Sequence, residues 1–390
     1  MSRTRLFGSL CAFVFLVNFA RVVFAPLVGE FIGEFAIGEG TAGLIVTLAW
    51  LGSAAPRLPA GWALTRFSRR LVIVTSGAVL TLGALGVALA PGVPTLMAAA
   101  FAIGLASGVY FVAANPFVSE LFPERVGRAM GVHGTASQLA AVAAAPVVTV
   151  ALWYDWRLAF HGLAVAAAAT TVAFVALASR TDLPDAGAGD TDFLGGARSE
   201  WKLILTAVVL MGLTGFVWQG LFNFYELYMV EKELAPATAR NLLTVIFAAG
   251  VPAFLVSGYL ADRLPHVPYL LGIVSAFVGG VVLVVVSGGL AAVVAASVAV
   301  GFAIHMLFPA MDTYLLASLP DESRASAYAV YSAGMMSTQA AGSWAVGEAI
   351  EAGVAYDAVF LSLAGGLGAI VVAYAVLERA GRVPGGAAGA

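Results

Sequence analysis

The feature that most constrains this chain is a series of long apolar runs separated by short connections. An α-helix needs about 20 apolar residues to cross the hydrocarbon core of a bilayer, and twelve runs reach this length. Only 11% of the residues are charged, whereas a soluble domain carries roughly 25%. We therefore predict an all-α membrane protein with 12 transmembrane helices. The runs span 6–29, 42–64, 71–91, 94–120, 129–153, 158–179, 203–229, 238–260, 268–288, 290–317, 325–350 and 355–377.

The sparse charges and the single cysteine argue against several functions. The net charge of −3 offers no basic surface for nucleic acid, and Cys11 alone makes neither an intramolecular disulfide nor a cysteine metal site. Neither Lys202 nor Lys232, the only lysines, ends a Gly-Lys-Ser/Thr phosphate loop of an ATP-driven pump. No Ser/His/Asp or His-Glu-x-x-His arrangement indicates an intramembrane enzyme. We expect no nucleic-acid partner, no cofactor and no metal.

Positive charges in the connections predict the orientation of the chain. If both termini are cytoplasmic, the cytoplasmic connections hold 14 Lys and Arg residues, and the outer ones hold three, Arg157, Lys232 and Arg240. Lys and Arg near helix ends are retained on the cytoplasmic side during insertion. The sequence therefore predicts a multi-pass protein of the plasma membrane with both termini in the cytoplasm.

A polar, glycine-rich stretch divides the chain into two halves. We expect an N-terminal six-helix bundle over 1–180, a cytoplasmic linker over 181–200 and a C-terminal six-helix bundle over 201–390. A shift of 197 residues aligns the halves, and both start on the same side of the membrane, so the repeat is parallel. Parallel repeats of this kind build carriers that expose a central site to each side in turn. The aligned pairs are Thr47 with Thr244, Gly61 with Gly258, Arg66 with Arg263, Gly104 with Gly301, Ala106 with Ala303, Phe111 with Phe308 and Pro123 with Pro320.

Two of the connections carry related loop sequences. GYLADR runs from Gly258 to Arg263, and GWALTRFSRR runs from Gly61 to Arg70. Both resemble the loop signature of the major facilitator superfamily, and this resemblance covers the whole chain. It implies two six-helix bundles with gating contacts at these loops, where Asp262 carries more of an ionic latch because Thr65 replaces the signature's Asp in the first copy. The gating residues implied are Gly61, Arg66, Arg70, Glu120, Gly258, Asp262 and Arg263.

The segment PRLPAG around Arg57 resembles the nitrate/nitrite branch of that superfamily, in which an Arg-x-Pro segment precedes the same loop. The branch has a second Arg at the equivalent place in the other half, where this chain has Phe254. The Asn-Gly nitrate signature is also absent from 129–153 and 325–350. Nitrate is therefore a minor option, and an organic or other small anion fits equally well.

Arginines inside the predicted helices are candidates for solute binding. A charged side chain at a helix centre costs about 2.5–3.5 kcal/mol on insertion scales and usually faces an aqueous cavity or a partner. Arg57 lies about 10 Å from the inner end of its helix, and Arg21, one turn after Asn18, about 12 Å from the outer end. The two arginines form a positive cavity wall for an anion, or they are gate residues, with Arg57 bonding carbonyls and Arg21 pairing with Glu226.

Acids and histidines within the runs are candidates for energy coupling. Asp312, which the repeat aligns with Asn115, is the first candidate for proton coupling, because a carboxyl group in a low-dielectric setting can load and release a proton. Glu226 is the second. The alternative for Asp312 is a partner for Arg57 or a gate residue. His133 and His305 can titrate near neutrality, but each is equally well explained as a hydrogen-bonded packing residue.

Together these residues predict a secondary active transporter that moves a small polar, anionic solute by alternating access. A proton or counter-solute gradient would drive it, by symport or antiport. The alternatives are proton-coupled efflux of hydrophobic drugs and a non-transporting sensor on the same scaffold. The expected partners are the solute and membrane lipid, and we expect a monomer. The predicted substrate-binding residues are Asn18, Arg21, Arg57, Tyr110, Asn115, His133, Gln138, Trp218, Gln219, Asn223, His305, Tyr331 and Gln339.

Overall fold

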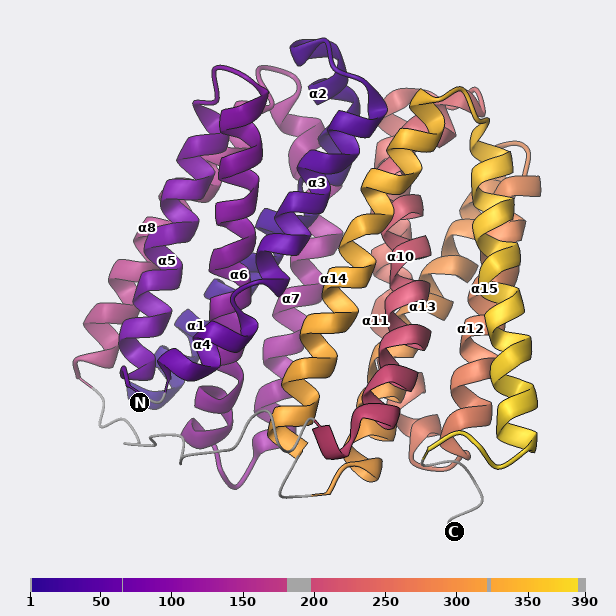
Figure 1. Cartoon of the computed structure of the whole chain (residues 1–390). Helices are drawn as coiled ribbons and strands as arrows, with labels where there is room; N and C mark the ends of the chain where they lie inside the picture. The colour runs from indigo at the N-terminus through magenta and orange to yellow at the C-terminus, as the bar shows by residue number, and fades with distance from the viewer. Residues whose placement is uncertain (1, 65, 181–197, 321–323, 385–390) are drawn as a thin grey trace. The chain divides into compact units, whose positions relative to one another are not determined.

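The computed structural model describes the chain except for residues 1, 65, 181–197, 321–323 and 385–390 (Figure 1). Over the described residues the regular structure is helical, and ten of these helices are long and apolar enough to cross a membrane. The pair α3 and α4, together with the more polar α14, occupies two further predicted runs. The prediction of an all-α fold with 12 crossings is thereby confirmed. The predicted linker lies outside the described residues except for 198–200.

The helices gather into two compact units, which we treat separately. The N-terminal unit comprises Met1–Ile37 and Leu44–Thr191, and the C-terminal unit comprises Gly38–Gly43 and Asp192–Ala390. The N-terminal unit is built from α1 (Ser2–Val22), η1 (Ala25–Leu27), α2 (Val28–Phe35), most of α3 (Glu39–Ala54), α4 (Arg57–Ala63), α5 (Arg69–Ala88), α6 (Val93–Leu121), α7 (Val126–Ala151) and α8 (Arg157–Ala178).

Two prolines interrupt runs that the sequence predicts as continuous helices. The run 42–64 is divided into α3 and α4 at Pro56, which has no amide hydrogen to donate and whose ring clashes with the preceding turn. The run 6–29 likewise ends as α1 at Val22, and Pro26 lies in the short η1 before α2 continues to Phe35. As a result, Arg57 is the first residue of a new helix rather than part of a continuous one (Figure 1).

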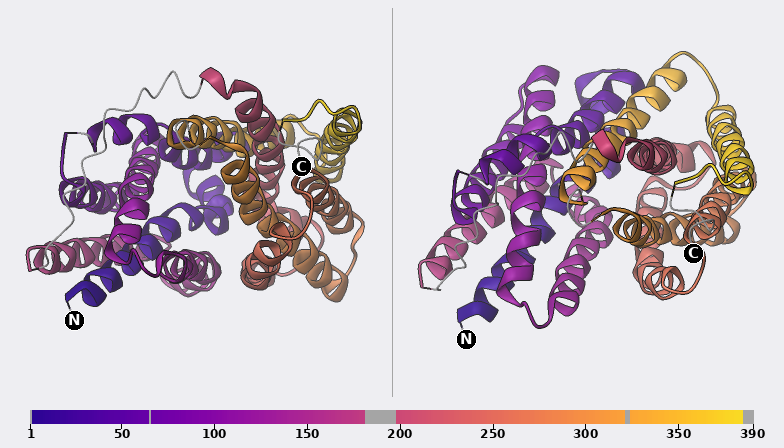
Figure 2. Two further views of the ribbon diagram at one scale, coloured as in Figure 1. Left: turned by 90° about the horizontal axis from the view of Figure 1, so that it is seen from below. Right: turned by 60° about the horizontal axis from the view of Figure 1, so that its bottom comes forward.

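The C-terminal unit consists mainly of six helices. α10 and α14 pack along one another, and so do α11 and α13, as the views of Figure 2 also show. Glycines permit the first of these contacts, because a Cβ on Gly342 would strike the carbonyl oxygen of Phe216. The helices are α10 (Trp201–Glu231), α11 (Pro236–Ala261), α12 (His266–Val286), α13 (Leu290–Ser318), α14 (Arg324–Glu351) and α15 (Tyr356–Arg379).

The two units repeat the same close helix contact at aligned positions. A Cβ on Gly104 of α6 would strike the carbonyl oxygen of Ala49 on α3, and a Cβ on Gly301 of α13 would strike that of Ile246 on α11. Both residues of the first contact align with those of the second under the 197-residue shift. The shift inferred from the sequence therefore aligns equivalent backbone positions, and it can be used to compare side chains in the two units.

Candidate functional site

Arg21 is the centre of a polar cluster inside the N-terminal unit. Its side chain is buried, with only 6% of the residue exposed, near the C-terminal end of α1. Its Nη1 donates to Ser53 Oγ at 3.3 Å. The guanidinium carbon also lies 4.7 Å from the centre of the Trp50 ring and 5.2 Å from that of Phe111. The charge is thus held by a hydroxyl and two aromatic faces, an arrangement that stabilises a cation without neutralising it.

Asn18 fixes the orientation of Arg21. Its Oδ1 accepts from Arg21 Nη2 at 2.8 Å, while its Nδ2 donates to the carbonyl oxygen of Ser137 on α7 at 2.7 Å. The amide cannot be turned around, because an NH₂ group cannot accept from a guanidinium. Asn18 therefore ties the position of the Arg21 head group to the backbone of α7.

Several buried hydrogen-bond donors near this arginine have no hydrogen-bond partner in the described part of the chain. They are Arg21 Nε, Trp50 Nε1 and Gln138 Nε2, the last one residue beyond Ser137. Buried polar atoms are nearly always paired, so each exception needs an explanation. The unpaired Nε of the Arg21 guanidinium and the Nε1 of the adjacent Trp50 are suited to a ligand that supplies only acceptors, such as a carboxylate or a phosphate.

Arg57 adds a second positive charge to this region. It is half-buried at the start of α4, and its guanidinium lies near enough to Arg21 for the two charges to repel each other. Asn115, a further predicted binding residue, is half-buried on α6 one turn beyond Phe111, and its Oδ1 has no hydrogen-bond partner among the described residues. The structure thus brings Asn18 and Arg21 together, with Arg57 near them.

The predicted alternative of an ion pair between Arg21 and Glu226 is wrong, because Glu226 binds Arg240. Glu226 Oε1 accepts from Arg240 Nη2 at 2.7 Å and its Oε2 accepts from Arg240 Nε at 3.1 Å. Both residues are buried, and Arg240 lies within the second turn of α11 rather than in an outer connection. Arg240 falls inside the predicted run 238–260 as well as inside α11, and its side chain reaches the acid on α10. Glu226 therefore has a bidentate partner.

Tyr110 and His133 are bound to each other inside the N-terminal unit. The Tyr110 hydroxyl donates to the carbonyl oxygen of Leu10 at 2.7 Å and lies 3.0 Å from His133 Nε2. Since the hydroxyl has one hydrogen, and Leu10 receives it, Nε2 is the donor in the second bond. Tyr110 also stacks on Phe13. These contacts join α1, α6 and α7, which supports the packing alternative for His133.

Asp312 lies on α13 and is bonded to the neighbouring α14. The Tyr328 hydroxyl donates to Asp312 Oδ1 at 2.8 Å. A single neutral donor does not compensate a full negative charge, so this half-buried carboxyl group keeps the capacity to take up a proton.

Aromatic side chains and one histidine form a cluster in the C-terminal unit. The centre of the Trp218 ring lies 6.0 Å from that of Phe247 and 5.9 Å from that of His305, and Phe254 lies 6.0 Å from His305. Phe308 stacks on Phe254 with centroids 6.3 Å apart. We call these five residues the aromatic cluster. It contains two predicted binding residues, Trp218 and His305.

The amides of the C-terminal unit form a network behind this cluster. Asn223 Nδ2 donates to Gln219 Oε1 at 2.9 Å and to Ser343 Oγ at 2.7 Å. Asn223 Oδ1 has no hydrogen-bond partner among the described residues. Gln339 packs against Gly215, where its side chain occupies the space that a Cβ would fill, and Tyr331 packs on Tyr328. Asn223 and Gln219 therefore bond to each other on α10, and Ser343 links both to α14.

The loop residues differ from the expected gating contacts. Glu120 pairs with Arg69, not with Arg66 or Arg70. Arg66 lies over Trp62 at 4.3 Å, and Arg263, its counterpart in the repeat, lies over Tyr259 at 3.4 Å.

The second loop contributes an acid and a glycine to the expected gating residues. Among the residues whose side chains the structure describes, Asp262 makes no ion pair, so the expected ionic latch stays a prediction. Gly258 lies inside α11 with no atom near an added Cβ, so it does not serve a close turn. Thr65 lies outside the described residues.

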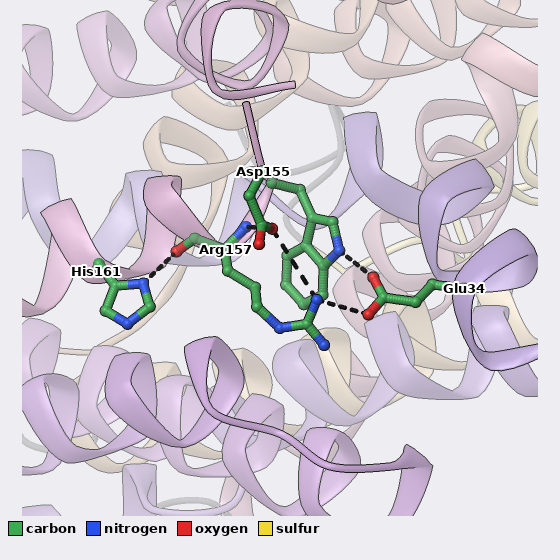
Figure 3. Close-up of polar contacts among 5 residues, drawn as sticks. Glu34, Asp155, Arg157 and His161 are labelled. Carbon is green, nitrogen blue, oxygen red and sulfur yellow. Dashed lines mark hydrogen bonds and ion pairs between the residues drawn. The ribbon is translucent and has the colours of Figure 1, made fainter. Parts of the chain in front are cut away.

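A further ion-pair cluster was not anticipated. The Glu34 carboxylate binds Arg157 Nη1 at 2.5 Å and accepts from Trp156 Nε1, which fastens the end of α2 to the start of α8 (Figure 3). Asp155 Oδ1 accepts from the Arg157 backbone N–H at 2.8 Å, one residue before the N-cap of α8 at Trp156. The sequence of these three residues does not identify Glu34 as the long-range partner of Arg157.

The partners of Arg21, Ser53 and Trp50, were not among the predicted site residues. The same holds for Phe247 and Phe254 of the aromatic cluster. The repeat was the available signal, because Trp50 aligns with Phe247 and both lie beside a predicted binding residue. In the described part of the chain, no three His, Cys, Asp or Glu side chains gather in a group that could hold a metal ion.

Comparison with known proteins supplies the context for these clusters. The sequence model described as Major Facilitator Superfamily matches residues 10–342 and 229–389. Among solved structures, a nucleoside transporter, NupG, is 14% identical with a TM-score of 0.79, covering 95% of this chain and 99% of that one. A POT family transporter in complex with 5-aminolevulinic acid is 14% identical with a TM-score of 0.78 and 95% coverage of both chains. A bacterial homolog of the human lysosomal transporter Spinster is 15% identical with a TM-score of 0.73, covering 96% of this chain and 94% of that one. At these identities the likeness shows a shared fold.

Proposed function

The chain belongs to the Major Facilitator Superfamily and is a secondary transporter, and we propose that its solute is a small organic anion bound through Arg21. The observation that carries this proposal is the group of side chains around Arg21 in the N-terminal unit, which we call the arginine cluster and which consists of Asn18, Arg21, Trp50, Ser53, Arg57 and Phe111. Arg21 is buried and pairs with no carboxylate among the described residues, and its own Nε and the Nε1 of the adjacent Trp50 have no hydrogen-bond partner there. A charged side chain inside a membrane protein costs free energy, and such residues usually mark a functional site.

The local chemistry favours a carboxylate or phosphate over other solutes. A guanidinium presents its donors in a plane that matches two acceptor oxygens, and charge-assisted bonds of this kind are among the strongest hydrogen bonds in proteins. Trp50 Nε1 and Gln138 Nε2 supply additional donors. Arg57 raises the local positive potential. An organic cation would meet two repelling charges, so the cluster argues against export of cationic drugs.

Alternating access would then use this cluster as one of its binding elements. In transporters built from parallel repeats, rocking of the two halves exposes the solute to each side of the membrane in turn. Bound anion would offset the repulsion between Arg21 and Arg57, so the occupied protein differs in electrostatic energy from the empty one. We propose Asp312 as the coupling carboxyl group, because its one hydrogen-bond donor leaves its charge largely uncompensated.

The first test is a thermal-shift screen of the purified protein. A ligand that binds only the folded state raises the apparent melting temperature, by an amount that grows with its concentration relative to Kd. Carboxylates and phosphates are expected to stabilise wild type and Arg379→Gln, a control arginine exposed at the end of α15. Arg21→Gln and Arg57→Gln are expected to lose this shift. If only organic cations or neutral sugars stabilise wild type, the proposal fails.

A conservative replacement separates the loss of a binding charge from the loss of folding. Arg21→Lys keeps the positive charge but cannot present two parallel donors to one carboxylate. It is expected to retain part of the anion response, between wild type and Arg21→Gln. Equal responses of Arg21→Lys, Arg21→Gln and wild type to anions would show that this side chain does not contact the solute.

A further inference from the structure

The long helices of the N-terminal unit carry positive charge in their middle parts but no negative charge. α1, α4, α5, α7, α8 and the part of α3 from Leu44 onward contain no Asp or Glu. α6 contains only Glu120, in its last turn, where it binds Arg69. The other acids of the unit lie in the short α2 or in connections. The arginine cluster thus contains two positive charges, and the helices around it supply no carboxylate to offset them.

Both arginines are anchored at one contact between α3 and α6. Arg21 Nη1 donates to Ser53 Oγ at 3.3 Å. A Cβ on Gly108 of α6 would lie 2.4 Å from the carbonyl oxygen of Ser53 and 2.6 Å from Pro56 Cγ. Arg57 follows Pro56 directly and begins α4. The two guanidinium groups therefore belong to one small region of a single unit, where their charges repel each other.

The fold does not require charge at either position. Under the 197-residue shift, Arg21 aligns with Trp218 and Arg57 aligns with Phe254, and both counterparts are uncharged. The C-terminal unit nevertheless keeps the equivalent glycine contact between α11 and α13. Because a charge within a membrane-spanning unit costs free energy, two neighbouring arginines that packing does not need point to a bound anion.

The Arg21 side of the cluster suits one anionic group. Nη1 and Nη2 of Arg21 already donate to Ser53 and Asn18, whereas its Nε and Trp50 Nε1 have no acceptor among the described residues. The two oxygens of a single carboxylate can accept from these two donors. A carboxylate bound there offsets one of the two positive charges, and the charge of Arg57 is left for a second anionic group.

From this charge distribution we infer that the solute is an organic dianion, such as a dicarboxylate, with one anionic group at Arg21 and the other at Arg57. This inference rests on the proposed function, because it takes the anion at Arg21 as given. It adds the substrate class and names Arg57 as a specificity-determining residue. A monoanion is a poorer solute, because it leaves one positive charge of the cluster uncompensated.

The test compares succinate with succinamate, in which a neutral amide of similar shape replaces one carboxylate. At about pH 7.5, well above the usual pKa of a carboxyl group, succinate carries two charges and succinamate carries one. Binding to the purified full chain is measured by titration calorimetry. Wild type is expected to bind succinate at least about tenfold more tightly than succinamate, a factor that corresponds to about 1.4 kcal/mol.

Variants of Arg57 separate its charge from its shape. Arg57→Gln is expected to weaken succinate binding more than succinamate binding, so that the affinity ratio, measured at higher ligand concentrations, falls to about 2 or less. Arg57→Lys keeps the positive charge and is expected to keep a ratio of about 5 or more. Arg379→Gln, at the exposed end of α15, is the control and should keep the wild-type ratio. Helical circular dichroism checks that each variant is folded.

The two proposals fail in distinguishable ways. If wild type binds carboxylates but prefers succinate over succinamate by less than about tenfold, the dianion assignment is overturned while the proposed function stands. The same holds if Arg57→Gln keeps the wild-type ratio. If no carboxylate binds to wild type, the proposed function itself has failed.

Discussion

Asn18 shows how one neutral residue can govern a charged one. Its amide is used at both ends, by Arg21 and by the Ser137 carbonyl oxygen. The arginine is therefore oriented by a partner that adds no negative charge, which keeps its charge available to a solute. An aspartate of nearly the same shape would pair with the guanidinium directly.

Asn18→Asp should consequently weaken anion binding without a large change in the shape of the side chain. The new carboxylate neutralises Arg21 and can no longer donate to Ser137. We expect succinate affinity to fall by at least about tenfold, equivalent to roughly 1.4 kcal/mol, as measured by calorimetry. Asn241→Asp provides the matched control, because Asn241 bonds only to the preceding turn of α11. Unchanged succinate affinity in Asn18→Asp would remove Asn18 from the site.

At the scale of elements, the two units treat proline differently. Pro56 divides α3 from α4, whereas Pro252, aligned one residue before it, lies within the continuous α11. The break gives Arg57 a helix start of its own and places Pro56 against Gly108. The direction of the Arg57 side chain therefore depends on the helix break at Pro56.

Pro56→Ala is expected to join α3 and α4, since alanine supplies the missing amide hydrogen for the carbonyl oxygen of Gly52. Hydrogen exchange of the amides at 55–58 should slow, and anion uptake should fall because Arg57 is redirected. Pro252→Ala serves as the comparison, with little effect expected on uptake. Fast exchange at 55–58 together with normal uptake in Pro56→Ala would refute this role.

The ion pair of Glu226 and Arg240 connects α10 to α11 in a buried setting. Removing one partner of such a pair leaves an uncompensated charge and costs about 3–5 kcal/mol, whereas replacing both with apolar residues costs little or stabilises. Arg240→Met should therefore lower the melting temperature strongly, and Arg240→Met combined with Glu226→Leu should restore most of it. Additive losses in the double variant would show that the pair is not coupled.

For the molecule as a whole, the sequence was sufficient to predict the helices, their number and the internal repeat. Hydropathy and loop motifs encode these directly. It also nominated Arg21, Asn18 and Gln138, because polar groups in apolar runs are conspicuous. It did not predict that Glu226 binds Arg240 or that Glu120 binds Arg69. Such pairings depend on how each helix is rotated about its axis and how far it is shifted along the membrane normal. Mean hydropathy determines neither of these.

The internal repeat also shows how the two units differ. Equivalent backbone positions carry a guanidinium cluster in one and rings in the other. The glycine contacts of α3 with α6 and of α11 with α13 are kept in both units while the side chains around them differ.

The most direct measurement is counterflow of labelled succinate in proteoliposomes loaded with unlabelled succinate. Wild type should accumulate label transiently, Arg379→Gln should behave in the same way, and Arg21→Gln should accumulate no more than empty vesicles. Counterflow needs a full cycle of binding and exchange on both sides of the membrane, so a sensor that only binds gives no signal. An absence of counterflow in wild type despite succinate binding, or undiminished counterflow in Arg21→Gln, would contradict the account.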